Sequence, residues 1–186
     1  MTSEINNAIE VLVKGGLILY PTDTVWGIGC DATNEAAVKK VFALKQRNDS
    51  KALICLVAND AMLERHVEQV PDVAYDILDL ATKPTTIIYD NPQGLAKNAI
   101  AQDNTMAIRV ASDKFCQYLI NKFKKPIIST SANIAGQPTP KGFSEISTPI
   151  LKGVDYIVNL QHDKKNGPPS SIIKLANDGT VKVIRE

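Results

Sequence analysis

Two kinds of apolar segment alternate along this chain of 186 residues. In one kind, apolar residues recur every three or four positions, which is the spacing of an amphipathic helix, and in the other they form short runs typical of buried strands. The helices are expected at 5–13, 37–44, 60–66, 71–81 and 113–123. The strands are expected at 17–20, 53–57, 86–89, 106–110, 126–129, 154–158, 170–174 and 180–184. This alternation predicts an α/β fold, a twisted mixed sheet flanked by helices.

Capping and turn residues mark the ends of several of these segments. Ser3 and Ser112 are the expected N-caps of the first and last helices, and Thr33 or Asn34 is the expected cap of the second. Asn177-Asp178-Gly179 separates the last two strands and is typical of a tight hairpin turn. The chain is therefore expected to end in a β-hairpin.

A polar loop, Tyr20-Pro-Thr-Asp-Thr-Val-Trp-Gly27, follows the first expected strand. Thr22, Asp23 and Thr24 present two hydroxyls and a carboxylate where that strand ends. Ligands of open α/β sheets bind beyond the carboxyl ends of strands, so this loop is a candidate binding segment. Asp23 is the one candidate carboxylate for a metal ion here, and an Asx-type turn within its own loop is the alternative.

A second loop of the same kind occurs in Ile127-Ile-Ser-Thr-Ser-Ala-Asn-Ile-Ala-Gly136. A β-branched run gives way to small and polar residues, whose hydroxyls and N–H groups suit the close approach of a phosphate or a carboxylate. An ordinary surface turn would have the same local composition. In extended backbone, Ser129 and Ser131 lie two positions apart and face the same side, with Thr130 opposite.

Basic residues supply the third candidate element. Lys45, Arg47 and Lys51 place three cations between the second helix and the next strand, where they would bind an anion or simply complement the negative C-terminus of the helix. Arg109 interrupts the apolar run 106–110, so its guanidinium must meet an anion. A ligand is the favoured partner of Arg109, and a salt bridge on an edge strand is the alternative.

In this order the three elements resemble the YrdC-like family of threonylcarbamoyl-AMP synthases. The family is known for a Lys-x-Arg and Ser-x-Asn pairing, present here as Lys45-Gln46-Arg47 and Ser131-Ala132-Asn133. Together with the Tyr-Pro-Thr-Asp-Thr-Val-Trp-Gly loop the pattern is specific, and the likeness extends from Gly15 almost to the C-terminus. The resemblance implies a YrdC-like fold.

The resemblance also implies a reaction. L-Threonine, bicarbonate (or carbon dioxide) and ATP would be joined into threonylcarbamoyl-AMP, with release of pyrophosphate, for the threonylcarbamoyl modification of adenosine in tRNA. Mg²⁺ is expected with ATP, and no organic cofactor is implied. The expected partners are the substrates, tRNA or double-stranded RNA, and a downstream threonylcarbamoyl transferase complex.

Residue roles carry over from the family onto matching positions. The residues expected at L-threonine are Thr24, with Thr22 as a neighbour, Arg109, Ser129 and Ser170. The residues expected at ATP are Arg47, Lys51, Thr105, Ser131, Thr139 and Arg185. The residues expected to be catalytic are Lys45, Arg47, Ser131 and Asn133.

The chain departs from the family pattern at three places. Asn48 and Ala52 stand where proline is usual, and Lys83 stands where a Pro-Gly-Pro turn has glycine. Leu56 takes the place of a histidine that helps some members to hold threonine, which bears on threonine binding.

Composition limits the other functions open to the chain. We expect one domain over residues 1–186, because this length is enough for one buried core. The formal net charge of +1 gives no overall basic field for nucleic acid. Three widely spaced cysteines are expected to be reduced core thiols in a cytoplasmic protein, and two distant histidines form no tetrahedral metal set. The N-terminus resembles no secretion signal, and no apolar run reaches membrane-spanning length.

Two alternative functions stay open at this point. A paralogue with the same fold would bind tRNA or double-stranded RNA by shape, without adenylate chemistry. A carbamoyl-adenylate module of the kind found in hydrogenase maturation is the weaker alternative, because this chain lacks the accompanying domains.

The segment 161–169 has the composition of a flap.

Overall fold

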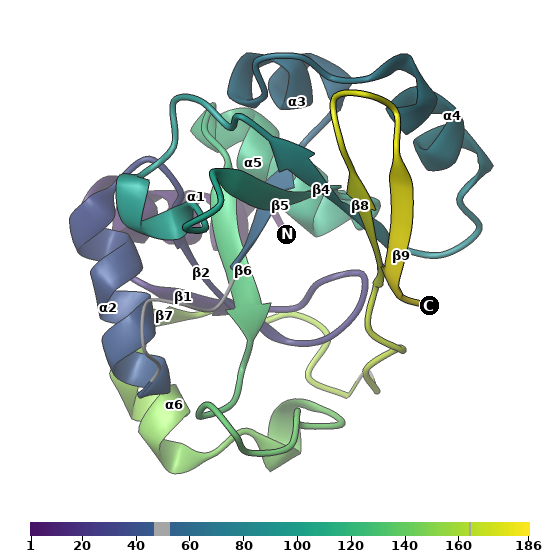
Figure 1. Ribbon diagram of the computed structural model, residues 1–186. Helices are drawn as coiled ribbons and strands as arrows, with labels where there is room; N and C mark the ends of the chain where they lie inside the picture. The colour runs from purple at the N-terminus through teal and green to yellow at the C-terminus, as the bar shows by residue number, and fades with distance from the viewer. Residues whose placement is uncertain (47–52, 164) are drawn as a thin grey trace.

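The computed structural model describes residues 1–46, 53–163 and 165–186. Over these residues the chain forms a nine-stranded sheet in the order β7-β1-β2-β6-β3-β5-β4-β8-β9 (Figure 1). The strands are β1 (Ile18–Tyr20), β2 (Gly27–Asp31), β3 (Ile54–Val57), β4 (Thr85–Asp90), β5 (Thr105–Val110), β6 (Ile127–Ser131), β7 (Tyr156–Ile157), β8 (Ser171–Leu175) and β9 (Val181–Arg185). The pairs β1–β7, β3–β5 and β4–β8 are parallel and the other pairs are antiparallel. The prediction of a mixed sheet is confirmed.

Helices complete the α/β architecture. They are α1 (Thr2–Val13), α2 (Glu35–Lys45), α3 (Asp60–His66), α4 (Asp72–Leu80), α5 (Lys114–Phe123), α6 (Thr148–Gly153) and the short 3-10 helices η1 (Lys97–Ala99) and η2 (Phe143–Glu145). Helix α1 packs on α5, and α2 packs on α6. In Figure 1, α2 and α6 lie on the left, and the β8–β9 hairpin lies at the opposite edge of the sheet. The sequence pattern does not indicate α6, because six residues carry too little periodicity.

The helices are held by apolar stripes that pack into the core. In α5 the buried residues recur at helical spacing and cover one face, which places the helix against the sheet. These buried residues are Phe115, Cys116, Leu119, Ile120 and Phe123. Within the described part of the chain, no helix has both the length and the apolar character needed to cross a membrane.

The expected helix caps are partly wrong. Asn34 caps α2, where its side-chain oxygen accepts a hydrogen bond from the backbone N–H of Ala37, as one of the two predictions had it. For α5 the cap is Asp113 and not Ser112, because the Ser112 hydroxyl donates to a carboxylate elsewhere. Ser3 lies inside α1, which begins one residue after Met1 and has no side-chain cap.

Strand β2 is absent from the sequence prediction because two of its five residues are glycines, which weaken a strand. Both glycines are required by close packing. A Cβ atom on Gly29 would lie 2.7 Å from the Cε1 atom of Tyr20, and one on Gly27 would lie 2.9 Å from the Oγ atom of Ser129. Strand β2 thus brings bare backbone up to β6, beside the polar residues of that strand.

Candidate active site

A cavity of about 370 Å³ lies over the sheet where β2, β3, β5 and β6 are neighbours. Its volume falls within the range of ligand pockets, roughly 300–1,000 Å³. The lining residues are Thr22, Thr24, Val25, Gly27, Ile54, Arg109, Ser129, Thr130, Ser131, Thr139, Pro140, Lys141, Asn166, Gly167, Pro169, Ser170 and Arg185.

The floor of the cavity comes from one face of the sheet. Strand β6 continues through Ser131, two residues beyond its expected end, so Ser129 and Ser131 share a face as predicted. In register with Ser129 lie Gly29 on β2 and Ile54 on β3, and Gly27 lies opposite Ser131. Small residues on β2 therefore leave the serine hydroxyls accessible from the cavity.

Loops far apart in the sequence form the walls of the cavity. They are the loop 21–26 between β1 and β2, the loop 132–142 after β6, and the segment 158–170 before β8. The first two loops were predicted from the sequence as binding segments, whereas the third was interpreted only as a flap. Its cavity residues, Asn166 and Gly167, carry no motif that marks them, since their role depends on contacts with the other loops.

Most of the predicted ligand residues meet in this cavity. The predicted residues that line it are Thr22, Thr24, Arg109, Ser129, Ser131, Thr139, Ser170 and Arg185. They come from six separate parts of the chain, and no local rule of secondary structure would bring them together. Their individual roles in binding stay predictions.

Lys45 and Asn133 lie directly beside the cavity rather than in its lining. The Lys45 side chain is 2% exposed, and its ammonium donates to the carbonyl oxygens of Ser131 (2.5 Å) and Asn133 (2.7 Å). The Ser131 hydroxyl donates to Asn133 Oδ1 at 2.5 Å. The amide of Asn133 donates in turn to Gln137 O at 2.6 Å. Lys45 and the Ser-x-Asn element therefore form one hydrogen-bonded unit that fixes the loop after β6.

Three further predictions have a different outcome. Arg47 and Lys51, predicted to bind phosphates, lie outside the described residues, as do Asn48 and Ala52. Thr105, predicted to touch ATP, is not part of the cavity lining, and its hydroxyl donates to Asp103 Oδ1 at 2.7 Å. Its nucleotide contact stays a prediction.

Arg109 forms a buried ion pair with Asp23. The distance from Nη2 to Oδ1 is 2.8 Å, and the two side chains are only 4% and 8% exposed. Strand β5 lies inside the sheet between β3 and β4, so the alternative of an edge-strand salt bridge was wrong about the edge but right about the salt bridge. Arg109 also lines the cavity, and its buried Nε has no hydrogen-bond partner among residues 1–46, 53–163 and 165–186. The guanidinium thus keeps donor capacity beyond the ion pair.

Asp23 is already occupied by protein partners. Its Oδ2 atom accepts a hydrogen bond from the Ser112 hydroxyl at 2.9 Å, while Oδ1 pairs with Arg109. Both carboxylate oxygens are therefore engaged by protein groups, which does not favour the candidate role as a metal ligand, and the carboxylate turns away from its own loop. Among the described residues, no aspartate or glutamate lines the cavity, and no group of three metal-ligating side chains occurs. These residues do not fit a protein-held Mg²⁺.

Thr22 and Thr24 form a hydroxyl pair at the cavity. The Thr22 hydroxyl donates to Val25 O at 2.7 Å and accepts from the backbone N–H of Thr24 at 3.1 Å. The two hydroxyls lie 3.2 Å apart. Because the proton of Thr22 is used on Val25, Thr22 serves to shape the turn, and the hydroxyl of Thr24 is the one available to a ligand.

Ser170 and Arg185 form the C-terminal side of the cavity. Arg185 donates from Nε (3.0 Å) and Nη2 (2.7 Å) to the carbonyl oxygen of Ser170. The Ser170 hydroxyl lies 2.8 Å from the hydroxyl of Thr86 on β4. Ser170 is therefore held from both sides, and Arg185 lies across the end of β8 instead of projecting freely.

The cysteines take no part in this site. Cys30, Cys55 and Cys116 are free thiols and all are buried, as expected for core thiols. Burial raises the pKa of each thiol, so none is present as the nucleophilic thiolate at neutral pH.

Two of the departures from the family pattern can be located. Leu56 is fully buried next to Arg109 in the β3–β5 register and does not line the cavity. The carbonyl oxygen of Lys83 accepts a hydrogen bond from the hydroxyl of Thr85 at 3.0 Å. In this structure Leu56 packs in the core on the strand next to Arg109, outside the lining of the cavity.

Comparison with known proteins agrees with this geometry. The sequence model of the Sua5/YciO/YrdC family, described as telomere recombination, matches residues 10–186. A curated relative from Pseudoalteromonas translucida, named threonylcarbamoyl-AMP synthase, is 34% identical over 182 residues, which are 96% of each chain. A Vibrio cholerae protein of the same name is 31% identical over 171 residues, which are 90% of this chain and 91% of the relative.

Solved structures share the fold. E. coli YciO superimposes with a TM-score of 0.85 at 26% identity. The match covers 100% of this chain and 90% of the YciO chain. P. abyssi Sua5 in complex with L-threonine gives a TM-score of 0.80 at 25% identity over 92% of this chain, which spans about half (50%) of that protein. With the YrdC-like architecture in place and the family match extending over almost the whole sequence, the chain belongs to the Sua5/YciO/YrdC family.

Proposed function

We propose that this protein is an L-threonylcarbamoyladenylate synthase, which makes threonylcarbamoyl-AMP and pyrophosphate from L-threonine, bicarbonate or carbon dioxide, and ATP. The names of its curated relatives and the threonine complex of P. abyssi Sua5 support this activity. The observation that carries the proposal is the single cavity in which Thr24, Arg109, Ser129 and Ser131 meet.

Arg109 is proposed to bind the carboxylate of threonine. A guanidinium offers five donors in a plane, and among the described residues its ion pair is with Asp23, through Nη2. The buried Nε of Arg109 lacks a partner, and an unpaired buried donor is costly, so an anionic oxygen in the cavity would relieve it. Asp23 offsets the positive charge and fixes the plane of the guanidinium. Thr24, Ser129 and Ser170 would meet the rest of the amino acid.

The nucleotide is proposed to lie on the side of Ser131, Thr139 and Arg185. Ser131 and Asn133 are joined to each other and to Lys45, so this part of the wall is rigid. Lys141 adds a cation to the lining. Arg47 and Lys51 are proposed to hold phosphate oxygens, since cations must offset the repulsion between ATP and a carbamate.

The reaction needs two bond-forming steps. The neutral amine of threonine attacks the carbon of carbon dioxide and loses a proton, which gives a carbamate. A carbamate oxygen then attacks the α-phosphorus of ATP, and the bond from that phosphorus to the bridging oxygen breaks, so that its electron pair leaves with pyrophosphate. The described lining provides hydroxyls, amides and cations, so the chain acts by holding the reactants together and stabilising charge, which supplies several kcal/mol.

Magnesium and RNA enter the proposal as partners of the substrates and products. Because the described carboxylates do not fit a metal site, Mg²⁺ is proposed to arrive with ATP on its phosphate oxygens. Threonylcarbamoyl-AMP would be consumed by a transferase that modifies adenosine in tRNA.

Pyrophosphate release tests the proposal. The purified protein should release pyrophosphate from ATP only when both L-threonine and bicarbonate are present. Thr24→Val removes the hydroxyl at the cavity and keeps the shape, so it should raise the KM for threonine. Thr85→Val is the matched control, because it loses a hydroxyl bonded to Lys83 O away from the cavity. Equal release without threonine, or none at all from folded protein, refutes the proposal. Salt-dependent binding of double-stranded RNA would then favour the RNA-binding alternative.

A further inference from the structure

Asn166 joins all three loops that form the cavity walls. Its Nδ2 donates to Pro140 O at 2.6 Å, and its Oδ1 accepts from the backbone N–H of Trp26 at 3.2 Å. Its own backbone N–H donates to Lys141 O at 2.9 Å. The next residue, Gly167, donates from its backbone to Thr24 O at 2.8 Å. These four hydrogen bonds, at two adjacent residues, connect the segment 158–170 to loops that lie about 25 and about 140 positions earlier in the sequence.

These contacts lie next to the residues that are proposed to hold the two substrates. On one side, Gly167 binds the backbone of Thr24, the proposed threonine contact. On the other side, the side chain of Asn166 binds Pro140, which follows Thr139, the proposed ATP contact. Asn166 itself lines the cavity, and both ends of its amide are bonded to backbone groups. The residue therefore sets the spacing between the threonine side and the ATP side.

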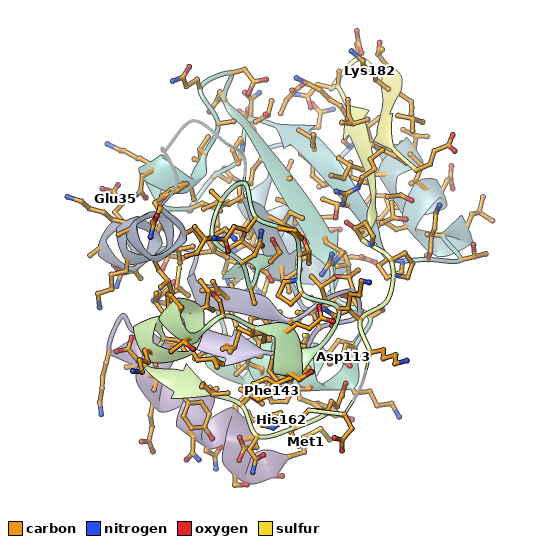
Figure 2. All side chains as sticks on the ribbon, turned by 90° about the horizontal axis from the view of Figure 1, so that it is seen from below. Met1, Glu35, Asp113, Phe143, His162 and Lys182 are labelled. Carbon is orange, nitrogen blue, oxygen red and sulfur yellow. The ribbon has the colours of Figure 1, made fainter. Side chains whose placement is uncertain are left out.

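An aromatic cluster packs beside these loops, with rings from loop 21–26, from η2 and from segment 158–170. The rings of Phe143 and His162 are stacked, with centroids 3.9 Å apart and planes 6° from parallel (Figure 2). The indole of Trp26 packs on both, at 4.9 Å from Phe143 and 5.5 Å from His162. This cluster supplies apolar contact but little directional control. The hydrogen bonds of Asn166 and Gly167 supply directional contacts between the segment 158–170 and the other two loops.

We infer that Asn166 is a positioning residue of the synthase site: its amide, bonded to Trp26 and Pro140, holds the loops that carry Thr24 and Thr139 at the separation that the reaction between threonine carbamate and ATP requires. The inference rests on the proposed function for the identity of the substrates. The expected signature is a loss of reaction rate, because a small misplacement of bound reactants can cost on the order of a hundredfold in rate.

Two substitutions separate the two ends of the amide. Asn166→Asp keeps an oxygen for the N–H of Trp26 but places a carboxylate against Pro140 O, so it should open the wall between those loops. Asn166→Ala removes both contacts. Both variants should lower kcat/KM for threonine and for ATP by tenfold or more, whereas a direct ligand contact would affect one substrate only.

A double-mutant cycle distinguishes positioning from a general structural role. If Asn166 acts through the loop of Thr24, the effect of Asn166→Ala on kcat/KM should be much smaller in a Thr24→Val background than in the wild type. Fully additive effects would overturn the inference. The matched control is Asn59→Ala. Asn59 also accepts from a backbone N–H and donates from its amide, but it caps α3 away from the cavity. Asn59→Ala should leave kcat/KM unchanged.

Limited proteolysis provides a test that does not depend on activity. Trypsin cuts after lysine, and Lys141 and Lys165 flank the contacts of Asn166. Cleavage after these two lysines should become faster in Asn166→Ala and stay at the wild-type rate in Asn59→Ala. Unchanged cleavage in Asn166→Ala would overturn the inference. If the wild type makes no threonine-dependent pyrophosphate, the proposed function fails, and the proteolysis still decides whether Asn166 holds the loops.

Discussion

The ammonium of Lys45 donates a hydrogen bond of 2.5 Å to the carbonyl oxygen of Ser131, across 86 positions of sequence. Lys45 ends helix α2 and Ser131 ends strand β6, so the contact ties a helix C-terminus to the loop that borders the cavity. A second bond to Asn133 O fixes the same loop two residues further on. Lys45 thus shapes the site by holding the backbone of the loop after β6, without lining the cavity itself.

Replacement of Lys45 by methionine should destabilise the protein. The apolar side chain fills similar space but leaves the part-buried carbonyls of Ser131 and Asn133 without this donor, at a cost of about 1–3 kcal/mol for each lost charge-assisted bond. Urea unfolding measures the change. Lys40→Met is the matched control, because Lys40 donates to Gly15 O at 2.8 Å from an exposed position. Equal losses in the two variants would contradict a special role for Lys45.

Alanine at the two glycines of β2 should affect two different properties, stability at Gly29 and threonine binding at Gly27. A Cβ on Gly29 meets the ring of Tyr20 in the core, so Gly29→Ala should lower the free energy of unfolding by about 1–3 kcal/mol. A Cβ on Gly27 meets the Ser129 hydroxyl at the cavity, so Gly27→Ala should mainly raise the KM for threonine. Thermal melts and steady-state kinetics on both variants check this. The same loss of stability in both would argue against an open cavity floor.

Substitution of Asp23 by asparagine keeps the shape of the side chain but removes its charge, and it should weaken threonine binding. The buried Arg109 would lose its charged partner, which in buried ion pairs costs about 3–5 kcal/mol when one member is removed. With the guanidinium no longer fixed, the KM for threonine should rise more than the KM for ATP. Added L-threonine should raise the melting temperature of the variant less than that of the wild type. An unchanged KM for threonine would show that Asp23 does not orient Arg109.

Stability should depend on the protonation of His66. Burial is the largest cause that lowers the pKa of His66 in the folded state below its ordinary value, against a smaller opposing effect of the contact between Nδ1 and Gln93 O. The neutral ring is therefore favoured by folding. Its contribution is present above the unfolded-state pKa of about 6.5 and is lost as pH falls through the folded-state pKa.

Urea unfolding from about pH 7.5 to about pH 5 measures this dependence. The wild type should lose stability as the pH falls, and His66→Gln should flatten that part of the curve. An identical pH dependence in the two proteins would exclude His66 as a contributor.

Much of the fold was predictable because its elements carry local patterns. The five expected helices and most strands follow from apolar spacing, and the resemblance in the polar loops located Thr24, Ser129 and Ser131. Strand β2 was not predictable. Gly27 and Gly29 disfavour a strand in isolation, and only packing against Tyr20 and Ser129 makes glycine necessary there.

The site itself was only partly predictable. Arg109 stood out because a charge in an apolar strand needs a partner, but the sequence could not show that Asp23 is that partner. Ser112 reads as a helix cap until the structure brings it to Asp23, 89 positions away. Asn166 has no local signal at all, since its function lies in backbone contacts with two other loops.

Direct detection of the product tests the central claim that this cavity joins threonine to ATP. The purified protein is incubated with ATP, L-threonine and ¹³C-labelled bicarbonate, and the mixture is analysed at once by mass spectrometry. The account predicts threonylcarbamoyl-AMP that carries one ¹³C atom from the wild type, and strongly reduced product from the folded Arg109→Lys variant. Well-folded wild-type protein that binds ATP but yields no labelled adenylate would contradict it.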